Sequence, residues 1–384
     1  MKKLRVLALV MAFVMAMTMF VGCGKEKEEE KKKEADTIKI GFIGPLTGET
    51  AQYGENVRNG AKMYIDEVNA AGGINGKQIE FIDYDDKSEP TDAASAYSRL
   101  VDQDGVCAII GPVTTNCANA VAELAAEDGI PVITSSGTGD SLTEVGKTFF
   151  RTCYKDSFQG TKIAQYMSEI LGYKKVAVLY NSAADYSVGL ANAFKAECEK
   201  VGITIVANES YAGGDTDYKS QLTNIAAAAP EAIFFPFYYS ECYMAAQQAK
   251  EANVNVPFFG GDGFAGLCEI ESVDPKVVEG FIFSDHFFVE DKNTAAKSFT
   301  EKYESQFGSS PLGFAYLSYD AAQIVVNAIK ETDSTDWATI VAAMKKTDID
   351  CLTGHYKFDE QNNPLKQCAM KIIKDGKYTA DRMY

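Results

Sequence analysis

Short apolar runs alternate with longer amphipathic segments along the chain from Thr37 onward. In residues 53–71, the apolar side chains recur at helical spacing, and a glycine-rich turn at 72–76 ends the helix. Strands that alternate with helices in this way are typical of parallel sheets with crossover helices. The pattern predicts strands at 38–44, 78–84, 108–111 and 130–134, with helices at 53–71 and 115–127.

A second series of the same kind begins after residues 149–152. Its predicted strands are 175–180, 204–206, 232–235 and 258–260, and helix-length segments separate them. Two consecutive series predict an α/β protein with two doubly wound lobes, each with a parallel central sheet. About 345 residues follow position 36, which fits two lobes on size alone.

The ends of the predicted strands carry mostly small residues, hydroxyl residues and glycine. In doubly wound folds, ligands bind beyond the carboxyl ends of the strands. Here those positions hold GPLTG at 44–48, GPVTT at 111–115, SSGT at 135–138, YNS at 180–182 and GGDG at 260–263. We therefore expect the ligand-binding residues among these segments.

The first 36 residues follow a different pattern. A basic start (MKKLR) precedes the uncharged apolar run 6–20, and Gly22 comes just before Cys23. This order resembles a bacterial lipoprotein signal, so we expect residues 1–22 to be removed and Cys23 to carry a lipid. The alternatives are an ordinary signal peptide or a short anchor, although the run of about 15 residues is shorter than a spanning helix needs. Residues 24–36, mainly Lys and Glu, predict a solvated tether.

The chain is acidic. Its formal net charge of −17 becomes −20 once residues 1–22 are removed, because three positive charges (Lys2, Lys3 and Arg5) leave with them. An acidic domain is repelled by nucleic acid and by anionic lipid headgroups. We therefore expect neither of these as a partner.

The cysteines and histidines indicate no metal or catalytic centre. The eight cysteines after Cys23 are scattered singly, and some lie in apolar runs, where cysteine behaves as a small core residue. Cys107 and Cys117 are the pair to test first for a disulfide. Only His286 and His355 are available, and no CxxC, Gly-x-Ser-x-Gly, HExxH or phosphate-loop motif occurs. We expect no metal, no cofactor and no enzymatic activity.

Several segments, taken in order, resemble the substrate-binding proteins of branched-chain amino acid ABC transporters, which have a type I periplasmic-binding fold. The segments are IGFIGPLTG at 40–48, AQYG at 51–54, GGING at 72–76, YDD at 84–86, FRT at 150–152 with Asp156 and Gln159-Gly160, and GGDG at 260–263. The resemblance covers essentially everything from Thr37 to the C-terminus.

The resemblance also implies how the lobes connect. In this family, a three-stranded hinge joins the lobes, and the ligand cleft lies between them. We place the crossings near Asp156, near Asp285-His286 and near Leu352-Thr353. The first lobe then comprises 37–156 and 286–352, and the second lobe comprises 157–285 and 353–384.

The resemblance assigns roles at the two polar ends of an amino acid. Thr115 opens the predicted helix after Gly111-Pro112, where backbone N–H groups and the helix dipole suit a carboxylate, although Thr115 could simply be the N-cap. By resemblance, Thr115 and Thr138 donate to the ligand carboxylate, and the Ser136 carbonyl and Asp262 receive its ammonium group. A buried ammonium without a carboxylate nearby is costly, although Asp262 also suits an Asp-Gly turn.

Aromatic residues are expected around the ligand side chain. Rings provide large apolar walls, although any of these rings could instead pack in the core. By resemblance they are Tyr53, Tyr186, Tyr238 and Phe314. The best-known members have a disulfide at the positions of Thr114 and Ser88, so this chain lacks that disulfide. We also place Thr114 in the site. Asp262 stands where they have the longer Glu.

These features together predict a monomeric lipoprotein on the outer face of the cytoplasmic membrane. The resemblance implies that its lobes close around leucine, isoleucine or valine and that it delivers the amino acid to an ABC permease coupled to a cytoplasmic ATPase. One alternative keeps the fold but changes the ligand to an amide, urea or an aromatic acid. Another makes the protein a membrane-tethered sensor that signals to a receptor.

Overall fold

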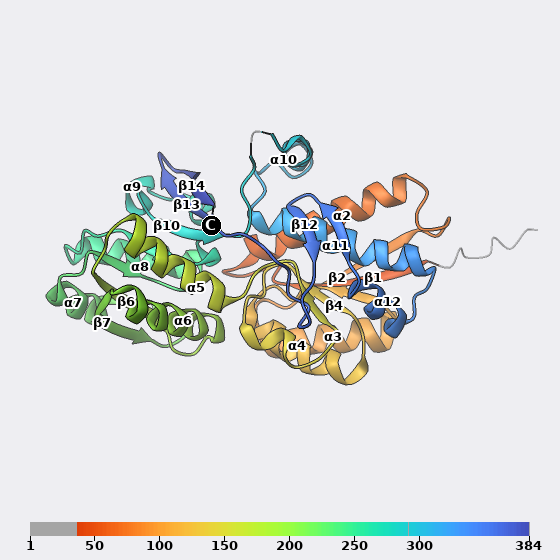
Figure 1. The fold of residues 1–384 in the computed structure, drawn as a ribbon, viewed down its shortest axis with the longest axis horizontal. Coiled ribbons are helices and arrows are strands. Elements are labelled where there is room, and N and C mark those ends of the chain that lie inside the picture. Colours follow the sequence, from red (N-terminus) through yellow and green to blue (C-terminus); the bar gives the residue numbers. More distant parts are fainter. Residues whose placement is uncertain (1–36, 291, 384) are drawn as a thin grey trace, which may run out of the picture. The chain divides into compact units, whose positions relative to one another are not determined.

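The computed structural model describes residues 37–290 and 292–383, which belong to one compact unit. The predicted signal segment, the lipidation site at Cys23 and the tether lie outside the described residues. Two sheets with helices packed around them form two lobes, one drawn mainly in orange, yellow and blue and the other mainly in green and cyan in Figure 1. The predicted α/β fold with two parallel central sheets is confirmed.

The first lobe contains a parallel sheet in the order β2-β1-β3-β4-β5. Its strands are β1 (Ile38–Gly44), β2 (Ile79–Asp85), β3 (Ala108–Ile110), β4 (Val132–Thr134) and β5 (Phe149–Arg151). The helices of this lobe are α2 (Ala51–Ala70), α3 (Pro90–Arg99), α4 (Thr115–Asp128), α10 (Thr294–Phe307), α11 (Gly313–Thr332) and α12 (Trp337–Met344). The last three come from the far end of the sequence, so this lobe is discontinuous.

The second lobe contains a sheet in the order β14-β13-β10-β9-β8-β6-β7. Its strands are β6 (Lys175–Asn181), β7 (Thr204–Tyr211), β8 (Ala232–Phe234), β9 (Phe258–Gly260), β10 (Ile282–Asp285), β13 (Ala369–Lys374) and β14 (Lys377–Met383). Strands β6 to β10 run parallel, whereas β13 and β14 pair antiparallel at one edge. The helices are α5 (Asp156–Gln165), α6 (Asp185–Val201), α7 (Lys219–Ala228), α8 (Tyr239–Glu251) and α9 (Pro275–Val278).

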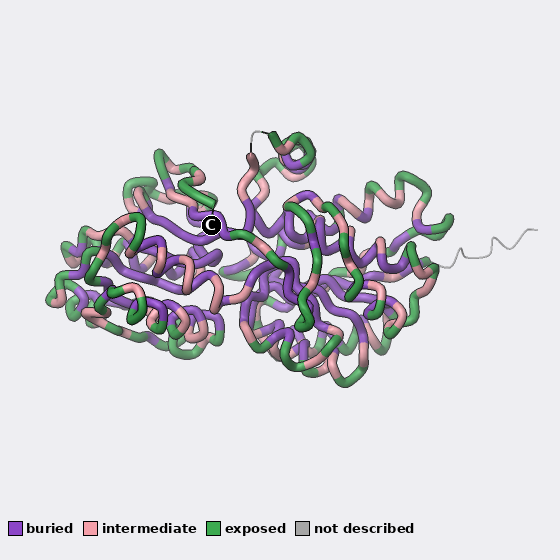
Figure 2. The backbone as a smooth tube through the Cα atoms, in the orientation of Figure 1, coloured by how far each residue is buried: buried purple, intermediate pink, exposed green. Residues whose placement is uncertain are grey.

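The central strands are almost entirely apolar because helices cover both faces of a parallel sheet. Every residue of β3, β4, β8 and β9 is buried, and Figure 2 shows the buried segments in the interior of each lobe. Helix α11, which the sequence pattern did not predict, packs against α2. The two backbones approach so closely at Gly60 that a Cβ there would lie 2.0 Å from the carbonyl oxygen of Ala315. This contact requires glycine.

Three segments join the lobes. The first runs from β5 to α5, the second from β10 to α10, and the third leads to β13 from the hairpin of β11 (Asp348–Cys351) and β12 (Gly354–Lys357). Asn362 Nδ2 donates to the carbonyl oxygens of Lys147 (3.2 Å) and Phe149 (3.1 Å), both in the first lobe. We therefore propose that the third crossing follows Asn363, later than the predicted 352/353 boundary. The other lobe boundaries stay predictions.

Within the described residues, the eight cysteines are all free thiols, including Cys107 and Cys117, and most are buried. None of the described helices is both long and apolar enough to cross a membrane. The same part of the chain contains no cluster of three or more His, Cys, Asp or Glu side chains suited to a metal ion.

A buried carboxyl group makes the stability of the second lobe depend on pH. Glu241 in α8 is 6% exposed, and it accepts a hydrogen bond from the Tyr211 hydroxyl at 3.0 Å. Burial raises the pKa of Glu241 from 4.5 to about 7. A raised pKa means that the folded state binds this proton more tightly than the unfolded state. Its contribution to stability is therefore complete below about pH 4.5 and is lost as the pH rises to about 7.

We expect Glu241→Gln to raise the free energy of unfolding by about 2 kcal/mol at pH 8 and to change it little at pH 4. The neutral amide does not incur the cost of burying a charge at the higher pH. Urea unfolding of both proteins at the two pH values measures the difference. An equal change at both pH values would contradict the role of ionisation.

Candidate ligand-binding site

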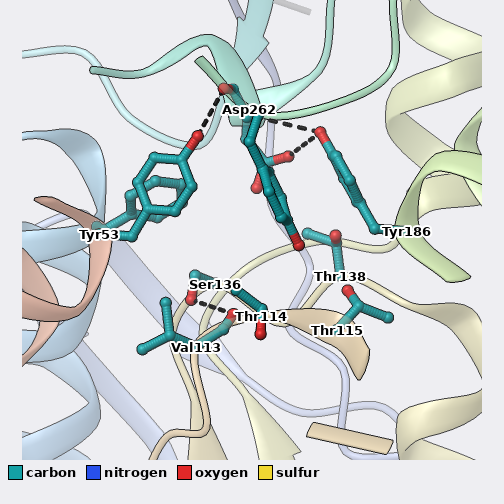
Figure 3. A pocket seen from close by; sticks show the side chains of 11 residues that line it. Tyr53, Val113, Thr114, Thr115, Ser136, Thr138, Tyr186 and Asp262 are labelled. Atoms are coloured by element: carbon teal, nitrogen blue, oxygen red, sulfur yellow. Dashed lines mark hydrogen bonds between the residues drawn. The ribbon is translucent and has the colours of Figure 1, made fainter. Parts of the chain in front are cut away.

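The residues that the sequence placed in the site line one cavity to which both lobes contribute. They are Tyr53, Thr114, Thr115, Ser136, Thr138, Tyr186, Tyr238, Asp262 and Phe314, and Val113 and Gly263 complete the lining. In Figure 3, Asp262 lies with Tyr53 and Tyr186 on one side, and the threonines and Ser136 lie on the other. The structure brings all nine together, but their role in ligand binding stays a prediction.

One end of the cavity is formed by the start of α4. At Gly111, φ is +108°, and a Cβ there would lie 2.1 Å from the carbonyl oxygen of Ile43, so glycine is needed where the chain turns after β3. The helix begins at Thr115, and its N-cap is Thr114 rather than Thr115. The Thr114 side chain makes no capping hydrogen bond. The first amides of α4 therefore remain available to an anion, as helix N-termini commonly are.

Two threonine hydroxyls add to this end of the cavity. Thr114 Oγ1 and Thr138 Oγ1 are buried and have no hydrogen-bond partner among the described residues. A buried hydroxyl without a partner costs about 1–3 kcal/mol, so such groups in a cavity are candidates for contact with a ligand. Each of them can donate one hydrogen bond to a carboxylate.

A buried arginine holds the loop that carries Ser136 and Thr138. Arg151 is completely buried, and its guanidinium donates to the carbonyl oxygens of Thr138 (3.0 Å) and Gly139 (2.9 Å). The Ser136 hydroxyl donates to the carbonyl oxygen of Val113 at 2.8 Å. The side chain of Ser136 is thus occupied within the first lobe, so what Ser136 could offer a ligand is its carbonyl oxygen.

The other end of the cavity is formed by Asp262, which follows β9 and is 3% exposed. Its Oδ1 accepts hydrogen bonds from the Tyr186 hydroxyl at 2.9 Å and from Gln159 Nε2 at 3.2 Å. Its Oδ2 lies 2.9 Å from His286 Nε2. These three neighbours hold the carboxylate in a defined orientation, and the Tyr186 hydroxyl and the Gln159 amide do so without adding a formal charge.

Gln159 links Asp262 to a second buried carboxyl group. Gln159 Nε2 also donates to Asp156 Oδ1 at 2.8 Å, and Asp156 Oδ2 is buried with no partner among the described residues. Burial, and then the nearby Asp262 carboxylate, raise the pKa of Asp156 well above its ordinary value. A protonated Asp156 places no second negative charge beside Asp262.

The sequence pattern indicated Gln159 only as part of a motif, and it gave His286 no role in the site. Gln159 comes from α5, and His286 comes from the crossing just after β10. His286 follows the last residue of a buried strand, which is the position that ligand residues favour in this fold. In the sequence, the one signal for His286 was its place at the predicted second crossing between the lobes.

Aromatic rings form the walls between the two ends. The Tyr53 ring meets those of Tyr238 and Phe314 edge-on, with centroids 5.6 and 5.2 Å apart, and Tyr186 stacks on Tyr238 at 5.3 Å. Tyr53 belongs to the first lobe, and its hydroxyl donates to the carbonyl oxygen of Gly263 in the second lobe at 2.6 Å. A cavity with an anion-binding end, a carboxylate end and apolar walls suits a small zwitterion with an aliphatic side chain.

Comparison with known proteins places the chain in a family. Residues 37–374 match the family described as periplasmic binding protein. The chain belongs to the periplasmic binding protein family. A leucine-, isoleucine-, valine-, threonine- and alanine-binding protein of Pseudomonas aeruginosa is 31% identical to it over 332 residues, which are 86% of this chain and 87% of the relative. A Leu/Ile/Val-binding protein homolog of Brucella melitensis is 33% identical over 79% of this chain and 82% of the relative.

Solved structures agree with this assignment. LivJ of Streptococcus pneumoniae, a branched-chain amino acid transporter substrate-binding protein solved with isoleucine, superposes with a TM-score of 0.85. It is 36% identical, and the match covers 91% of this chain and 99% of LivJ. The leucine-binding protein LivK of Thermotoga maritima is 30% identical, with a TM-score of 0.84 over 90% of this chain and 98% of LivK. The predicted type I periplasmic-binding fold is therefore confirmed.

Proposed function

We propose that this periplasmic binding protein is the extracytoplasmic substrate-binding component of an ABC importer and that it binds leucine, isoleucine or valine. The observation that carries the proposal is the pairing of opposite ends in one cavity. Asp262 is suited to an ammonium group, and the start of α4 with Thr114 and Thr138 is suited to a carboxylate. Relatives and solved structures that are named for these amino acids support it.

Ligand binding and lobe closure are coupled in this proposal. The anion-binding end at the start of α4 belongs to the first lobe and Asp262 to the second, so one amino acid contacts both lobes only when the cleft is closed. A ligand that binds the closed state more tightly shifts the population toward that state. The closed form would be the one that a permease recognises.

The same proposal includes export and attachment. Cys23 would carry a lipid at the outer face of the cytoplasmic membrane, and residues 24–36 would tether the binding unit there. No catalytic step is part of the proposal, because the cavity combines binding groups without a nucleophile activated by a base.

Isothermal titration calorimetry of the full chain in mild detergent tests the ligand class. We expect leucine, isoleucine and valine to bind, and acetamide, urea and benzoate not to bind. Two matched analogues test each polar end: 4-methylpentanoate keeps the leucine skeleton and carboxylate but lacks the amine, and isopentylamine lacks the carboxylate. Both are expected to bind at least a hundredfold more weakly than leucine, since each leaves a buried polar end unpaired. Binding of 4-methylpentanoate as tight as that of leucine would overturn the ammonium assignment.

A further inference from the structure

His286 is a buried histidine at the junction of the site and the hinge. Its side chain is completely buried, Nε2 lies 2.9 Å from Asp262 Oδ2, and Nδ1 has no partner among the described residues. In a neutral imidazole, one ring nitrogen donates and the other accepts. Contact with a carboxylate favours the tautomer in which Nε2 carries the hydrogen and donates a hydrogen bond to Asp262.

The first two crossings between the lobes meet at this ring, and the third contacts it indirectly through Tyr154. His286 belongs to the second crossing, and its ring lies 3.9 Å from that of Tyr154 in the first crossing, centroid to centroid. The Tyr154 hydroxyl in turn contacts Cys368 Sγ at 3.8 Å, next to the start of β13 after the third crossing. The imidazole therefore has little room to move away from Asp262 while the hinge keeps this arrangement.

Several other ionisable groups face His286. Asp285 Oδ1 accepts its backbone N–H, and Asp285 Oδ2 is paired with Lys371 Nζ. Lys366 and His355 line an outer cavity that His286 also reaches. Asp262 after β9 and Tyr154 on the first crossing contact the ring itself. Asp156 on α5 is linked to Asp262 through Gln159, Cys368 on the third crossing contacts Tyr154, and Asp285 on β10 contacts the backbone N–H and pairs with Lys371 on β13. Lys366 on the third crossing, His355 on β12, and Glu290 and Lys292 before α10 only share the lining of the outer cavity with His286.

We infer that His286 is a positioning residue of the ammonium end, and that protonation of its ring competes with the ligand ammonium for Asp262. The inference rests on the proposed binding of an amino acid. The neutral ring donates to Oδ2 and leaves the charge of Asp262 for the ligand. A second proton makes the ring a cation beside that carboxylate. The charge of Asp262 is then already balanced by His286, so the ligand ammonium gains less from contact with it. Ligand binding thereby becomes linked to the release of a proton.

The expected result is weaker leucine binding as the pH falls. Histidine is the side chain that ordinarily changes charge in this range, and one competing proton lowers the affinity by about tenfold for each pH unit below its midpoint. Between pH 5 and 7, the carboxylate and ammonium of the ligand keep their charges. Calorimetry of the full chain in detergent with leucine at pH 5, 6 and 7 measures the profile.

Three variants separate positioning from a merely structural role. His286→Gln keeps an N–H donor but does not titrate, so we expect near-normal affinity at pH 7 and a flat profile. His286→Phe removes the donor, and it is expected to weaken binding by about ten- to a hundredfold relative to wild type at pH 7 and to give a flat profile, because a hydrogen bond to a charged group is lost. His355→Gln is the matched control, since His355 is exposed, pairs with Asp348 and Asp350 and has no contact with Asp262. It should keep the wild-type profile.

The possible outcomes are distinct. A wild-type protein that binds no amino acid at any pH would contradict the proposed function itself. A wild-type protein that binds leucine with the same affinity from pH 5 to 7 would overturn the inference about His286. The inference is also overturned if His286→Gln keeps the wild-type slope, because another group, such as Asp156, would then be responsible.

Discussion

Replacing Asp262 with alanine is expected to weaken the binding of leucine by about a hundredfold to a few thousandfold. In the closed cavity, the ligand ammonium would lose its only counter-charge among the lining residues. Removing one partner of a buried ion pair costs about 3–5 kcal/mol, and each 1.4 kcal/mol is a factor of ten in affinity. Isothermal titration calorimetry with leucine measures the loss, and the melting temperature shows that the variant is folded.

Two further variants show whether charge is the cause. Asp262→Asn keeps the size of the side chain and a carbonyl acceptor, so a loss as large as that of alanine would assign the effect to the negative charge. Glu199→Ala removes an exposed carboxylate from α6, outside the cavity, and should leave the affinity unchanged. If Asp262→Ala binds leucine normally, the ammonium lies elsewhere and the orientation of the ligand must be reversed.

Replacing Arg151 with methionine is expected to lower the free energy of unfolding by about 3 kcal/mol or more. The guanidinium donates to the carbonyl oxygens of Gly137, Thr138 and Gly139 in the interior of the protein. Without it, each of these buried acceptors loses a hydrogen bond to a charged donor, at about 1.5–3 kcal/mol each before relaxation. Each keeps one other partner, which is Cys153 Sγ, the Asp156 N–H or the Leu142 N–H. Urea unfolding measures the change. Leucine binding should weaken as well, because the loop that carries Thr138 loses its support.

Arg58→Met is the matched control for this variant. Arg58 is partly exposed, and its Nη1 lies 3.9 Å from Asp83 Oδ2, so its removal should cost less than about 1 kcal/mol. Arg151→Lys keeps the charge but cannot reproduce the planar fork of donors, and we expect it to recover only part of the stability. Equal losses for Arg151→Met and Arg58→Met would show that the buried hydrogen bonds contribute nothing specific.

Much of the fold could be predicted from local patterns. Strand β1 was predicted with the bounds that the structure shows, and β3, β6, β8, β9 and helix α4 lie within one residue of their predictions at each end. These elements are short apolar runs or amphipathic segments between glycine and polar residues, so their signal is local. Strand β7 was predicted to end at 206 but continues to Tyr211. Polar residues alternate with apolar ones along this edge strand, so the apolar run from which it was predicted is shorter than the strand itself. Helix α11 and strands β10, β13 and β14 had no assigned prediction.

The sequence by itself determined the series of strands and helices, the glycine and hydroxyl residues at the strand ends, and, mainly through the family resemblance, nine of the eleven residues that line the cavity. Only the tertiary structure decided what surrounds Asp262. Gln159 and His286 lie 103 and 24 positions from it in sequence, yet both contact its carboxylate. Hydrophobic periodicity reports which face of an element is buried, but it carries no information about which distant side chain shares that space. The partners of a buried charge are therefore set by packing between elements.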